Sequence, residues 1–429
     1  MTAITIAPAT RGLRGHLVVP SDKSIAHRAL LFGAIAEGTT TIDGFQGGRD
    51  NRATLAACRA LGVTVDERGE TLCVHGTGFD GLRAAAAAID CENSGTTMRL
   101  LTGVLAGRPF TSRLVGDGSL LRRPMRRVME PLIRMGATIT SEPGDGRAPL
   151  RIEGRPLRGA EHLLAVASAQ VKSAILLAGL QAEGTTRVEE PMRSRDHTER
   201  MLQDFGVALA RGERWVTLDG PQALRGIPIA LPGDFSSAAF LVVAASLVPG
   251  SELRLTGVGL NPTRTGLLDV LNAMGAAIEV VPDGNGAEPM GSLVIRYRPL
   301  QATRVAGDLL VRSIDEFPIL CIAAACAEGT SEIRDAAELR VKESDRIAVM
   351  AEMLRDLGVT VEELPDGLVI TGPVRLGGAQ VDPRGDHRIA MAAAVAGLVG
   401  RAPVTIRDPE CAEVSFPGFY AALAAAAGA

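Results

Sequence analysis

The sequence predicts an α/β protein of two domains, each built from three repeated units. Three observations support this. The chain has 429 residues and is 46% hydrophobic, which is enough for more than one large core. An Ala-rich, almost entirely apolar helix recurs at similar intervals, and a short β-branched strand follows it each time. The predicted helix starts are all polar residues: Ser21, Asn93, Ser168, Asp234, Asp315 and Asp386.

Each of these apolar helices stops near a Gly or Pro, and a strand of Val, Ile and Thr follows. Because the helices are apolar on every side, we expect them to lie inside a layer of other elements. The predicted strands are Thr39–Ile42, Thr111–Val115, Thr185–Val188, Glu252–Leu255, Thr330–Ile333 and Val404–Ile406.

A second, amphipathic helix completes each unit and is predicted to lie outside the first. Five of these helices end at a glycine that suits a C-terminal cap, and a hairpin follows, as in the tract 358–372 with its Pro-Asp-Gly turn. The five glycines are Gly62, Gly136, Gly206, Gly275 and Gly358.

The last unit lacks a closing hairpin, and the N-terminal stretch Ile4–Val19 is the predicted replacement. Six units then divide into two domains of three. We expect a discontinuous domain of residues 1–18 plus 234–429, and an inserted domain of residues 19–233. Periodicity alone leaves open whether the elements form a barrel or stacked layers.

Composition excludes several classes of function. The formal net charge is −4 and only 3% of residues are aromatic, which argues against a nucleic-acid surface. The six cysteines form no Cys-x-x-Cys pair and no zinc-finger spacing, so we expect buried thiols in a reducing compartment and no metal centre. The N-terminus lacks the features of a signal peptide, and the apolar runs are too short to span a bilayer. We expect a cytoplasmic protein.

The tract 338–346 is the most charged in the chain, with six ionisable residues out of nine. If it forms the first turns of a helix, Lys342 and Arg346 point the same way, with Glu343 and Asp345 beside them. Such a surface could hold an anion and move a proton. A charge run considered alone is more often a solvated helix with ion pairs.

The predicted inner helices begin with residues that suit anion binding. Helix N-termini carry free N–H groups and the positive end of the helix dipole, so they attract carboxylates and phosphates. Considered alone, the capping residues Ser21, Asn93 and Ser168 are most often only structural, and so are His27, His197 and His387. Their recurrence at equivalent positions favours a function, and if the two domains present these ends to each other, an anionic ligand lies between them. The tracts are Ser21–Arg28, Asn93–Arg99, Ser168–Lys172, Asp315-Glu316 and Asp386–Arg388.

Several tracts, in this order, resemble those of the 5-enolpyruvylshikimate-3-phosphate (EPSP) synthase family, and the resemblance covers nearly the whole chain. They are Pro20–Arg28, Asn93–Arg99, Arg123-Pro124, Ser168–Gln170, Leu339–Arg346 and Asp386–Arg388. The resemblance implies the enolpyruvyl transferase fold, in which two inside-out α/β domains each contain three repeats. It also implies transfer of the enolpyruvyl group of phosphoenolpyruvate to the 5-hydroxyl of shikimate 3-phosphate, through a tetrahedral intermediate, in aromatic amino-acid biosynthesis. We expect no cofactor, small-molecule substrates only, and a monomer. Phosphate-loop, dinucleotide and triad motifs are absent from the sequence.

The resemblance also assigns residues to roles. Asp315 is expected to be the base for the 5-hydroxyl, while Glu343 and Lys23 remain alternative donors of the proton to the methylene carbon. Shikimate 3-phosphate is expected to contact Lys23, Ser24, Arg28, Ser168, Ala169, Gln170, Arg195, Asp315 and Lys342. Phosphoenolpyruvate is expected to contact Lys23, Asn93, Gly95, Arg123, Gln170, Arg346 and Arg388.

Two departures from the family pattern matter. Val414 stands where many members carry a lysine, so one phosphoenolpyruvate contact is expected to be missing or replaced. Tracts Ser194–Thr198 and 338–346 look like those of a bacterial subgroup that includes glyphosate-tolerant members. Gly95, however, stands where the tolerant members carry a bulkier residue. We therefore expect glyphosate to inhibit.

Two alternatives remain. A carboxyvinyltransferase acting on UDP-N-acetylglucosamine has the same fold but uses a loop cysteine, and the corresponding loop here, ending at Met125, has none. A non-catalytic binder of phosphorylated sugars or acids would gain little from the carboxylates of Asp315 and Glu343.

Overall fold

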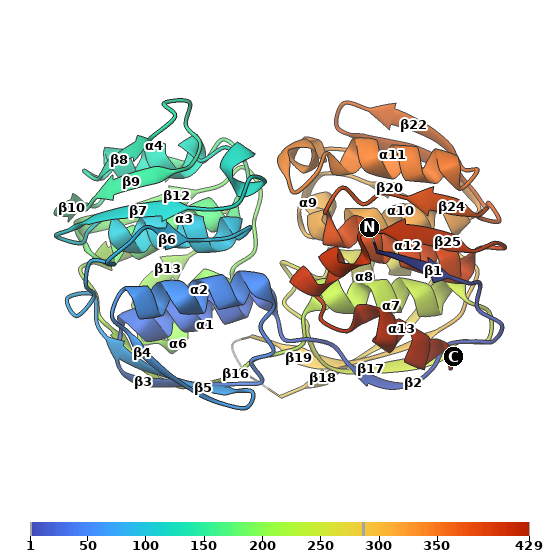
Figure 1. The fold of residues 1–429 in the computed structure, drawn as a ribbon, viewed down its shortest axis with the longest axis horizontal. Helices are drawn as coiled ribbons and strands as arrows, with labels where there is room; N and C mark the ends of the chain where they lie inside the picture. The colour runs from blue at the N-terminus through green and yellow to red at the C-terminus, as the bar shows by residue number, and fades with distance from the viewer. Residues whose placement is uncertain (1, 285–287, 429) are drawn as a thin grey trace. The chain divides into compact units, whose positions relative to one another are not determined.

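The computed structural model describes residues 2–284 and 288–428, and the chain forms two compact units (Figure 1). The inserted unit spans Ser21–Leu231, and the split unit consists of the chain up to Pro20 and from Pro232 onward. The domain boundaries predicted from the sequence, after residues 18 and 233, fall close to these positions.

The inserted unit is organised around three inner helices, α1 (Lys23–Ile35), α3 (Gly95–Leu105) and α5 (Ala169–Gly179). Every residue of α1 from Ile25 to Ile35 is buried, which confirms the prediction of an inner layer. Three outer helices carry polar residues on one side: α2 (Arg49–Ala60), α4 (Arg126–Arg134) and α6 (His197–Asp204). Figure 1 shows α2 beside α1 on the same side of the unit.

Each inner helix of the inserted unit leads into the central strand of a small sheet. β3 (Ala36–Asp43), β7 (Thr111–Val115) and β12 (Ala182–Glu189) contain the three predicted strands. Each pairs antiparallel with the near strand of a hairpin and parallel with a short strand. The hairpins are β4 (Thr64–Arg68) with β5 (Thr71–Thr77), β8 (Thr138–Ser141) with β9 (Leu150–Glu153), and β13 (Leu209–Arg211) with β14 (Trp215–Gly220).

The short parallel strands close the three repeats into a ring. β6 (Ile89–Asp90) follows the first repeat and pairs with β7, and β10 (Leu157–Arg158) and β11 (Glu161–Leu163) pair with β12. β15 (Leu224–Arg225) and β16 (Pro228–Ala230) follow the third repeat and return to β3 of the first. Each repeat therefore needs its neighbour to complete its sheet.

The split unit repeats this plan. Its inner helices are α7 (Phe235–Leu247), α10 (Phe317–Cys326) and α12 (His387–Val399), and its outer helices are α8 (Gly266–Ala273), α11 (Arg346–Asp356) and α13 (Phe419–Ala427). The short helix α9 (Gly307–Val311) precedes α10. The central strands are β17 (Glu252–Gly259), β21 (Gly329–Ile333) and β25 (Val404–Arg407). Two hairpins accompany them, β18 (Ala277–Asp283) with β19 (Met290–Arg296), and β22 (Thr360–Leu364) with β23 (Gly367–Gly372).

The N-terminal segment completes two sheets of the split unit. β1 (Ala3–Ile6) pairs antiparallel with β25, where the last repeat has no hairpin, and Ile4 lies opposite Ile406. β2 (Arg14–Val18) pairs parallel with β17 and so takes the place that β20 (Arg304–Val305) and β24 (Ala379–Val381) take in the other two sheets. The prediction that this segment supplies the missing strand is confirmed, and β2 in addition closes the ring.

The helix ends agree with the predicted glycine caps but correct three predicted starts. All five predicted glycines have positive φ, from 85° to 110°, just after an outer helix. The first inner helix is capped by Asp22, not Ser21, and the second by Ser94, not Asn93, because these side chains accept the amides of Ile25 and Thr97. The fifth begins after Glu316, since residues 314–316 form a 3₁₀ turn that includes Asp315.

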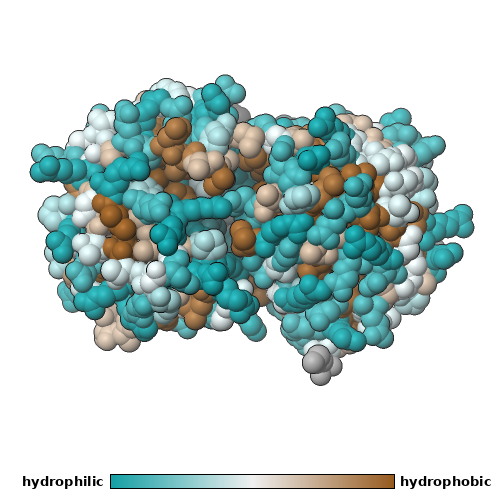
Figure 2. Space-filling view, turned by 90° about the horizontal axis from the view of Figure 1, so that it is seen from above, coloured by the Kyte–Doolittle hydropathy of each residue, from teal (hydrophilic) through white to brown (hydrophobic). Residues whose placement is uncertain are grey.

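The cysteines differ in part from expectation. Cys58, Cys91, Cys321 and Cys411 are buried, but Cys73 and Cys326 are partly exposed, and all six are free thiols. Hydrophilic residues predominate on the face shown in Figure 2, with apolar residues scattered among them. Within the described residues, the helices are too short or too polar to cross a membrane.

Candidate active site

The first turn of α1 holds Lys23 in a defined position. The Asp22 carboxylate caps the helix, so Lys23 is its first residue, and its ammonium lies 3.0 Å from the Asp50 carboxylate in the first turn of α2. The side chain of Asn51 donates to the Lys23 carbonyl at 3.0 Å. Two helices of the first repeat thus fix one partly exposed cation. Asp50 was not identified as the partner of Lys23 from the sequence, because it belongs to no predicted inner-helix start.

Arg28 is buried and joins three helices. Its Nε donates to the hydroxyl of Thr198 at 2.7 Å, and Nη2 donates to that of Ser173 at 2.8 Å. Its Nη1 donates to the carbonyl of Ser24 at 2.9 Å, which places these two residues on one face of α1, as predicted. The guanidinium therefore connects α1 to α5 and α6, in addition to any contact with a ligand.

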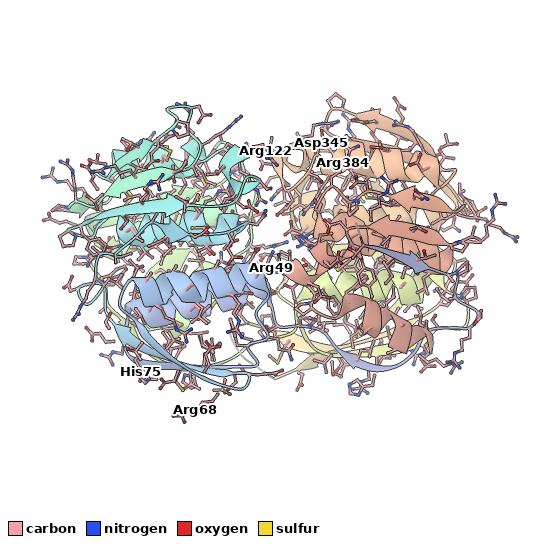
Figure 3. The ribbon with its side chains drawn as sticks, in the orientation of Figure 1. Arg49, Arg68, His75, Arg122, Asp345 and Arg384 are labelled. Atoms are coloured by element: carbon pink, nitrogen blue, oxygen red, sulfur yellow. The ribbon has the colours of Figure 1, made fainter. Side chains whose placement is uncertain are left out.

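Asn93 and Arg123 lie side by side before α3. Nη2 of Arg123 donates to Oδ1 of Asn93 at 2.5 Å, while the amide nitrogen of Asn93 donates to Asp117 at 2.6 Å. Arg123 follows the 3₁₀ turn Leu120–Arg122, and Figure 3 marks Arg122 at that turn. The structure therefore brings together two of the residues assigned to phosphoenolpyruvate.

Arg99 and Gln170 link α3 to α5. Nη1 of Arg99 donates to Oε1 of Gln170 at 2.6 Å, and Nε2 of Gln170 donates to the hydroxyl of Thr96 at 2.8 Å. Gly95 opens α3 directly beside them. A Cβ on this glycine would lie 2.6 Å from Nη1 of Arg99 and 3.4 Å from Nη1 of Arg123. Even an alanine would have to displace the guanidinium of Arg99.

The start of α5 is capped by Ser168, whose hydroxyl accepts the amide of Val171 at 3.4 Å. Ala169 and Gln170 follow as the first helical residues and are partly exposed. Arg195, also partly exposed, lies in the loop between β12 and α6. The sequence predicted these four residues as ligands of one substrate, and they all belong to the third repeat.

In the split unit, tract 338–346 is not the single helix that the sequence suggested. Residues Ala337–Val341 form a 3₁₀ turn, and the helix α11 begins only at Arg346. Asp345, marked in Figure 3, caps α11 by accepting the amide of Ala348, and it also receives a bond of 2.9 Å from Arg340. Capping interrupts the helix because the cap residue takes a non-helical backbone conformation.

Arg346 is the centre of a buried charge cluster. It is 1% exposed, and its Nε donates to Oδ2 of Asp386 at 2.8 Å, while Nη2 donates to Oε2 of Glu343 at 2.8 Å. Burial alone would lower the pKa of this guanidinium, but the charges of Asp386 and Glu343 raise it. For Asp386, burial raises the pKa, but the charge and hydrogen bond of Arg346, together with His387, lower it, and the net shift is downward. Both groups of this pair stay ionised.

Asp315 lies between two arginines. Its Oδ1 is 3.7 Å from Nη1 of Arg346, and its Oδ2 is 3.7 Å from Nη2 of Arg388. The backbone carbonyl of Asp315 also accepts from Nη1 of Arg388 at 3.0 Å. The amide of Arg388 in turn donates to Asp386, the cap of α12. The predicted base thus lies in the turn just before the N-terminus of α10, with about a fifth of its side chain exposed.

Lys342 is partly buried near the same carboxylates. Burial lowers the pKa of its ammonium, and the charges of Asp315 and Glu343 oppose that shift only in part. Its ammonium donates no hydrogen bond to any residue in the described ranges. Lys342, Glu343, Arg346, Asp315 and Arg388 therefore form one cluster in the split unit.

Several contributors were not identified as site residues from the sequence. Asp50, Asp117, Ser173 and Thr198 hold predicted ligands, but each lies in another element, and no spacing in the chain connects them to their partners. Val414 lies in the 3₁₀ segment Pro409–Val414 and is partly exposed. Among residues 2–284 and 288–428, His, Cys, Asp and Glu form no group of three or more that could hold a metal ion.

Comparison with known proteins gives a consistent result. The family described as EPSP synthase (3-phosphoshikimate 1-carboxyvinyltransferase) matches residues 8–423. The 3-phosphoshikimate 1-carboxyvinyltransferase of Geobacter sulfurreducens is 53% identical over 424 residues, which cover 99% of either chain. That of Bacillus velezensis is 50% identical over 410 residues, or 95% of this chain and 96% of that one.

Solved structures agree. The EPSP synthase of Acinetobacter baumannii superimposes with a TM-score of 0.88 at 44% identity, covering 99% of this chain and 98% of that one. The enolpyruvyl transferase NikO of Streptomyces tendae, at 19% identity, has a TM-score of 0.78 over 99% of this chain and 97% of that one, and this likeness concerns the fold alone. The predicted fold is confirmed, and the chain belongs to the EPSP synthase family.

Proposed function

We propose that this enzyme transfers the carboxyvinyl group of phosphoenolpyruvate to the 5-hydroxyl of shikimate 3-phosphate and releases phosphate. The observation that carries the proposal is the cluster in the split unit, where Asp315 lies 3.7 Å from both Arg346 and Arg388. Guanidinium groups bind carboxylates and phosphates in two places at once, and a carboxylate between them can take a proton from a bound hydroxyl.

Shikimate 3-phosphate would be held by the residues that the sequence predicts as its ligands. The hydroxyls of Ser24 and Ser168 and the guanidinium of Arg195 would contact its phosphate. The N-terminus of α5 favours a negative charge there, because its first amides point out of the helix. Further contacts would come from Lys23, Arg28, Ala169, Gln170, Asp315 and Lys342.

Phosphoenolpyruvate would be held mainly by arginines. Arg123 would reach it from the turn before α4, oriented by Asn93, while Arg346 and Arg388 would bind it from the split unit. Gly95 would let the substrate approach the backbone at the start of α3, and Lys23 and Gln170 would contact both substrates.

The reaction needs one group to take a proton and one to give it. Asp315 would remove the proton of the 5-hydroxyl as oxygen attacks the central carbon of phosphoenolpyruvate. Glu343 or Lys23 would protonate the methylene carbon, giving a tetrahedral adduct. The new methyl group would then return a proton as the C–O bond to phosphate breaks, which forms the carboxyvinyl product and free phosphate. Both candidates are held by an oppositely charged partner, Arg346 for Glu343 and Asp50 for Lys23.

The decisive experiment measures phosphate release from phosphoenolpyruvate. One reaction contains shikimate 3-phosphate and a parallel one contains UDP-N-acetylglucosamine. Release with shikimate 3-phosphate alone would support the proposal, and release with the nucleotide sugar alone would overturn the substrate. Tight binding of shikimate 3-phosphate without release in either reaction would indicate a non-catalytic binder. We further propose that the enzyme works as a monomer in the cytoplasm, which size-exclusion chromatography and cell fractionation would test.

A further inference from the structure

A buried ammonium in the inserted unit has no place in the mechanism proposed above. Lys172 lies in the first turns of α5, two residues after Gln170, on a helix that is otherwise almost entirely apolar. Its side chain is 3% exposed, and its Nζ lies 2.7 Å from Oε2 of Glu190 and 2.7 Å from Oε1 of Glu199. A buried ammonium is costly unless oppositely charged groups lie close to it. Lys172 therefore depends on both carboxylates keeping their positions.

Glu190 closes the bend that leads to Arg195. It is the residue after β12, and Oε1 accepts the hydroxyl of Ser194 while Oε2 accepts the amide of the same residue at 3.4 Å. Ser194 directly precedes Arg195. One carboxylate thus joins the two ends of a five-residue bend, and the same carboxylate is held by Lys172 from α5.

The other carboxylate fixes the far side of the same segment. Glu199 lies in the first turn of α6, next to Thr198, whose hydroxyl accepts from Arg28 at 2.7 Å. Ser173, the neighbour of Lys172, donates to the carbonyl of Ala169 and also bonds with Thr198. The segment that contains Arg195 is therefore attached at both ends to the first turns of α5, the helix that begins at Ser168.

We propose that Lys172, acting through Glu190 and Ser194, is a positioning residue for the phosphate contacts of shikimate 3-phosphate. It fixes the distance between Arg195 and the Ser168 end of α5, which belong to different elements of the third repeat. This inference rests on the proposed function, because it assumes that Arg195 and Ser168 bind the same phosphate.

The test compares binding and catalysis in single-residue variants of the whole enzyme. Ser194→Ala removes the hydroxyl that holds the bend but leaves the buried contacts of Lys172 with Glu190 and Glu199 in place, so folding should not change. Shikimate 3-phosphate is titrated calorimetrically, the KM of phosphoenolpyruvate is measured at saturating shikimate 3-phosphate, and Tm is recorded. The matched control is Ser246→Ala, since Ser246 is also fully buried and donates one hydrogen bond, at 2.8 Å to the Val242 carbonyl in the split unit.

Ser194→Ala should raise the Kd of shikimate 3-phosphate about tenfold, as expected for losing one hydrogen bond to a charged group. The KM of phosphoenolpyruvate and Tm should stay within the range of the control, and Ser194→Thr should restore tight binding. Lys172→Met should act in the same direction, and more strongly. An unchanged Kd in Ser194→Ala would overturn the inference, as would a Kd that changes only together with Tm. Failure of the wild-type enzyme to bind shikimate 3-phosphate would instead overturn the proposed function, and the inference with it.

Discussion

The inserted and split units share one plan, but the hydrogen bonds described above for their candidate-site arginines differ. In the inserted unit, the hydrogen bonds described for Arg28, Arg99 and Arg123 lead to hydroxyls, side-chain amides and backbone carbonyls. In the split unit, Arg346 is bonded to two carboxylates and Arg388 lies 3.7 Å from a third. Other cations of the inserted unit do pair with carboxylates, among them Lys23 with Asp50 and Lys172 with Glu190 and Glu199.

This difference indicates a division of labour. A neutral partner orients a guanidinium without itself reducing the positive charge. A carboxylate partner reduces the field of the arginine but adds a group that can take or give a proton. We therefore propose that the described contacts of the inserted unit favour anion capture, and that the carboxylates of the split unit add proton transfer to anion binding.

The largest expected effect comes from breaking the most buried carboxylate contact. Asp386→Ala should lower the free energy of unfolding of the split unit by about 3–5 kcal/mol, because Arg346 would be left buried beside a missing partner. Urea denaturation would measure this. Glu252→Ala, which breaks an exposed pair with Arg296, should cost less than about 1 kcal/mol. Similar losses in the two variants would contradict the claim that burial makes the Asp386 pair structurally important.

Removing the proposed base should affect turnover more than binding. Asp315→Ala should reduce kcat by a factor on the order of 10³, while the KM values of both substrates change far less. Stopped-flow and steady-state assays of phosphate release would show this. Asp308→Ala, which removes an exposed carboxylate paired with Arg312 in the same unit, should leave kcat unchanged. Equal losses in kcat and binding would exclude Asp315 as the base.

The sequence predicted the repeats well because they depend on local patterns. Apolar helices and glycine caps such as Gly62 and Gly358 are readable from neighbouring residues, and both have the positive φ that the cap requires. The helical interpretation of 338–346 failed because Asp345 caps α11 and thereby excludes Lys342 and Glu343 from it.

Motifs and the family resemblance predicted the candidate ligands but not the residues that hold those ligands in place. The contact between Lys172, Glu190 and Glu199 joins α5 to the loop after β12 and to α6. The spacing of these residues in the sequence does not predict it. Asp117 and Thr198 are similar, since each acts on a residue of another element. Contacts between distant elements decide how a guanidinium is held, and these contacts cannot be inferred from local patterns in a single sequence.

Gly95→Ala would disturb a neutral arginine contact in the inserted unit. The new Cβ would lie 2.6 Å from Nη1 of Arg99, so the nitrogen that donates to Gln170 must shift from its present position. We expect glyphosate to inhibit the wild-type enzyme, and the variant to raise its inhibition constant by a factor on the order of 10², about 2.7 kcal/mol, with a much smaller rise in the KM of phosphoenolpyruvate. Inhibition kinetics with phosphoenolpyruvate as the varied substrate would measure both. Parallel rises in the two constants would refute selective exclusion at Gly95.

The inserted unit also keeps a histidine neutral among its cations. The pKa of His27 is lowered from 6.5 to about 3, mainly by burial and to a smaller extent by Lys23 and Arg28, against the opposing charge of Asp50. Below pH 6.5 the unfolded chain takes up a proton that the folded unit does not, so stability falls as the pH falls. Between pH 6.5 and 5 this amounts to about 2 kcal/mol. Urea denaturation of the wild type and of His27→Gln over this range would show a shallower pH dependence in the variant, and equal slopes would contradict the assignment.

The smallest expected effect tests the comparison most directly, because it gives the inserted unit a carboxylate of the kind found in the split unit. Gln170→Glu keeps the shape of the side chain and its contact with Arg99, but it cancels the charge of that arginine and repels anionic substrates. Both KM values should rise about tenfold, or ~1.4 kcal/mol, with Tm unchanged.

Gln380→Glu is the matched control, since Gln380 is exposed on β24 and accepts a bond of 3.2 Å from Arg407 in the split unit. That variant should leave both KM values as they are. If Gln170→Glu instead lowers kcat and spares the KM values, the charge beside Arg99 matters for the chemical step, and the two units do not divide anion capture from proton transfer.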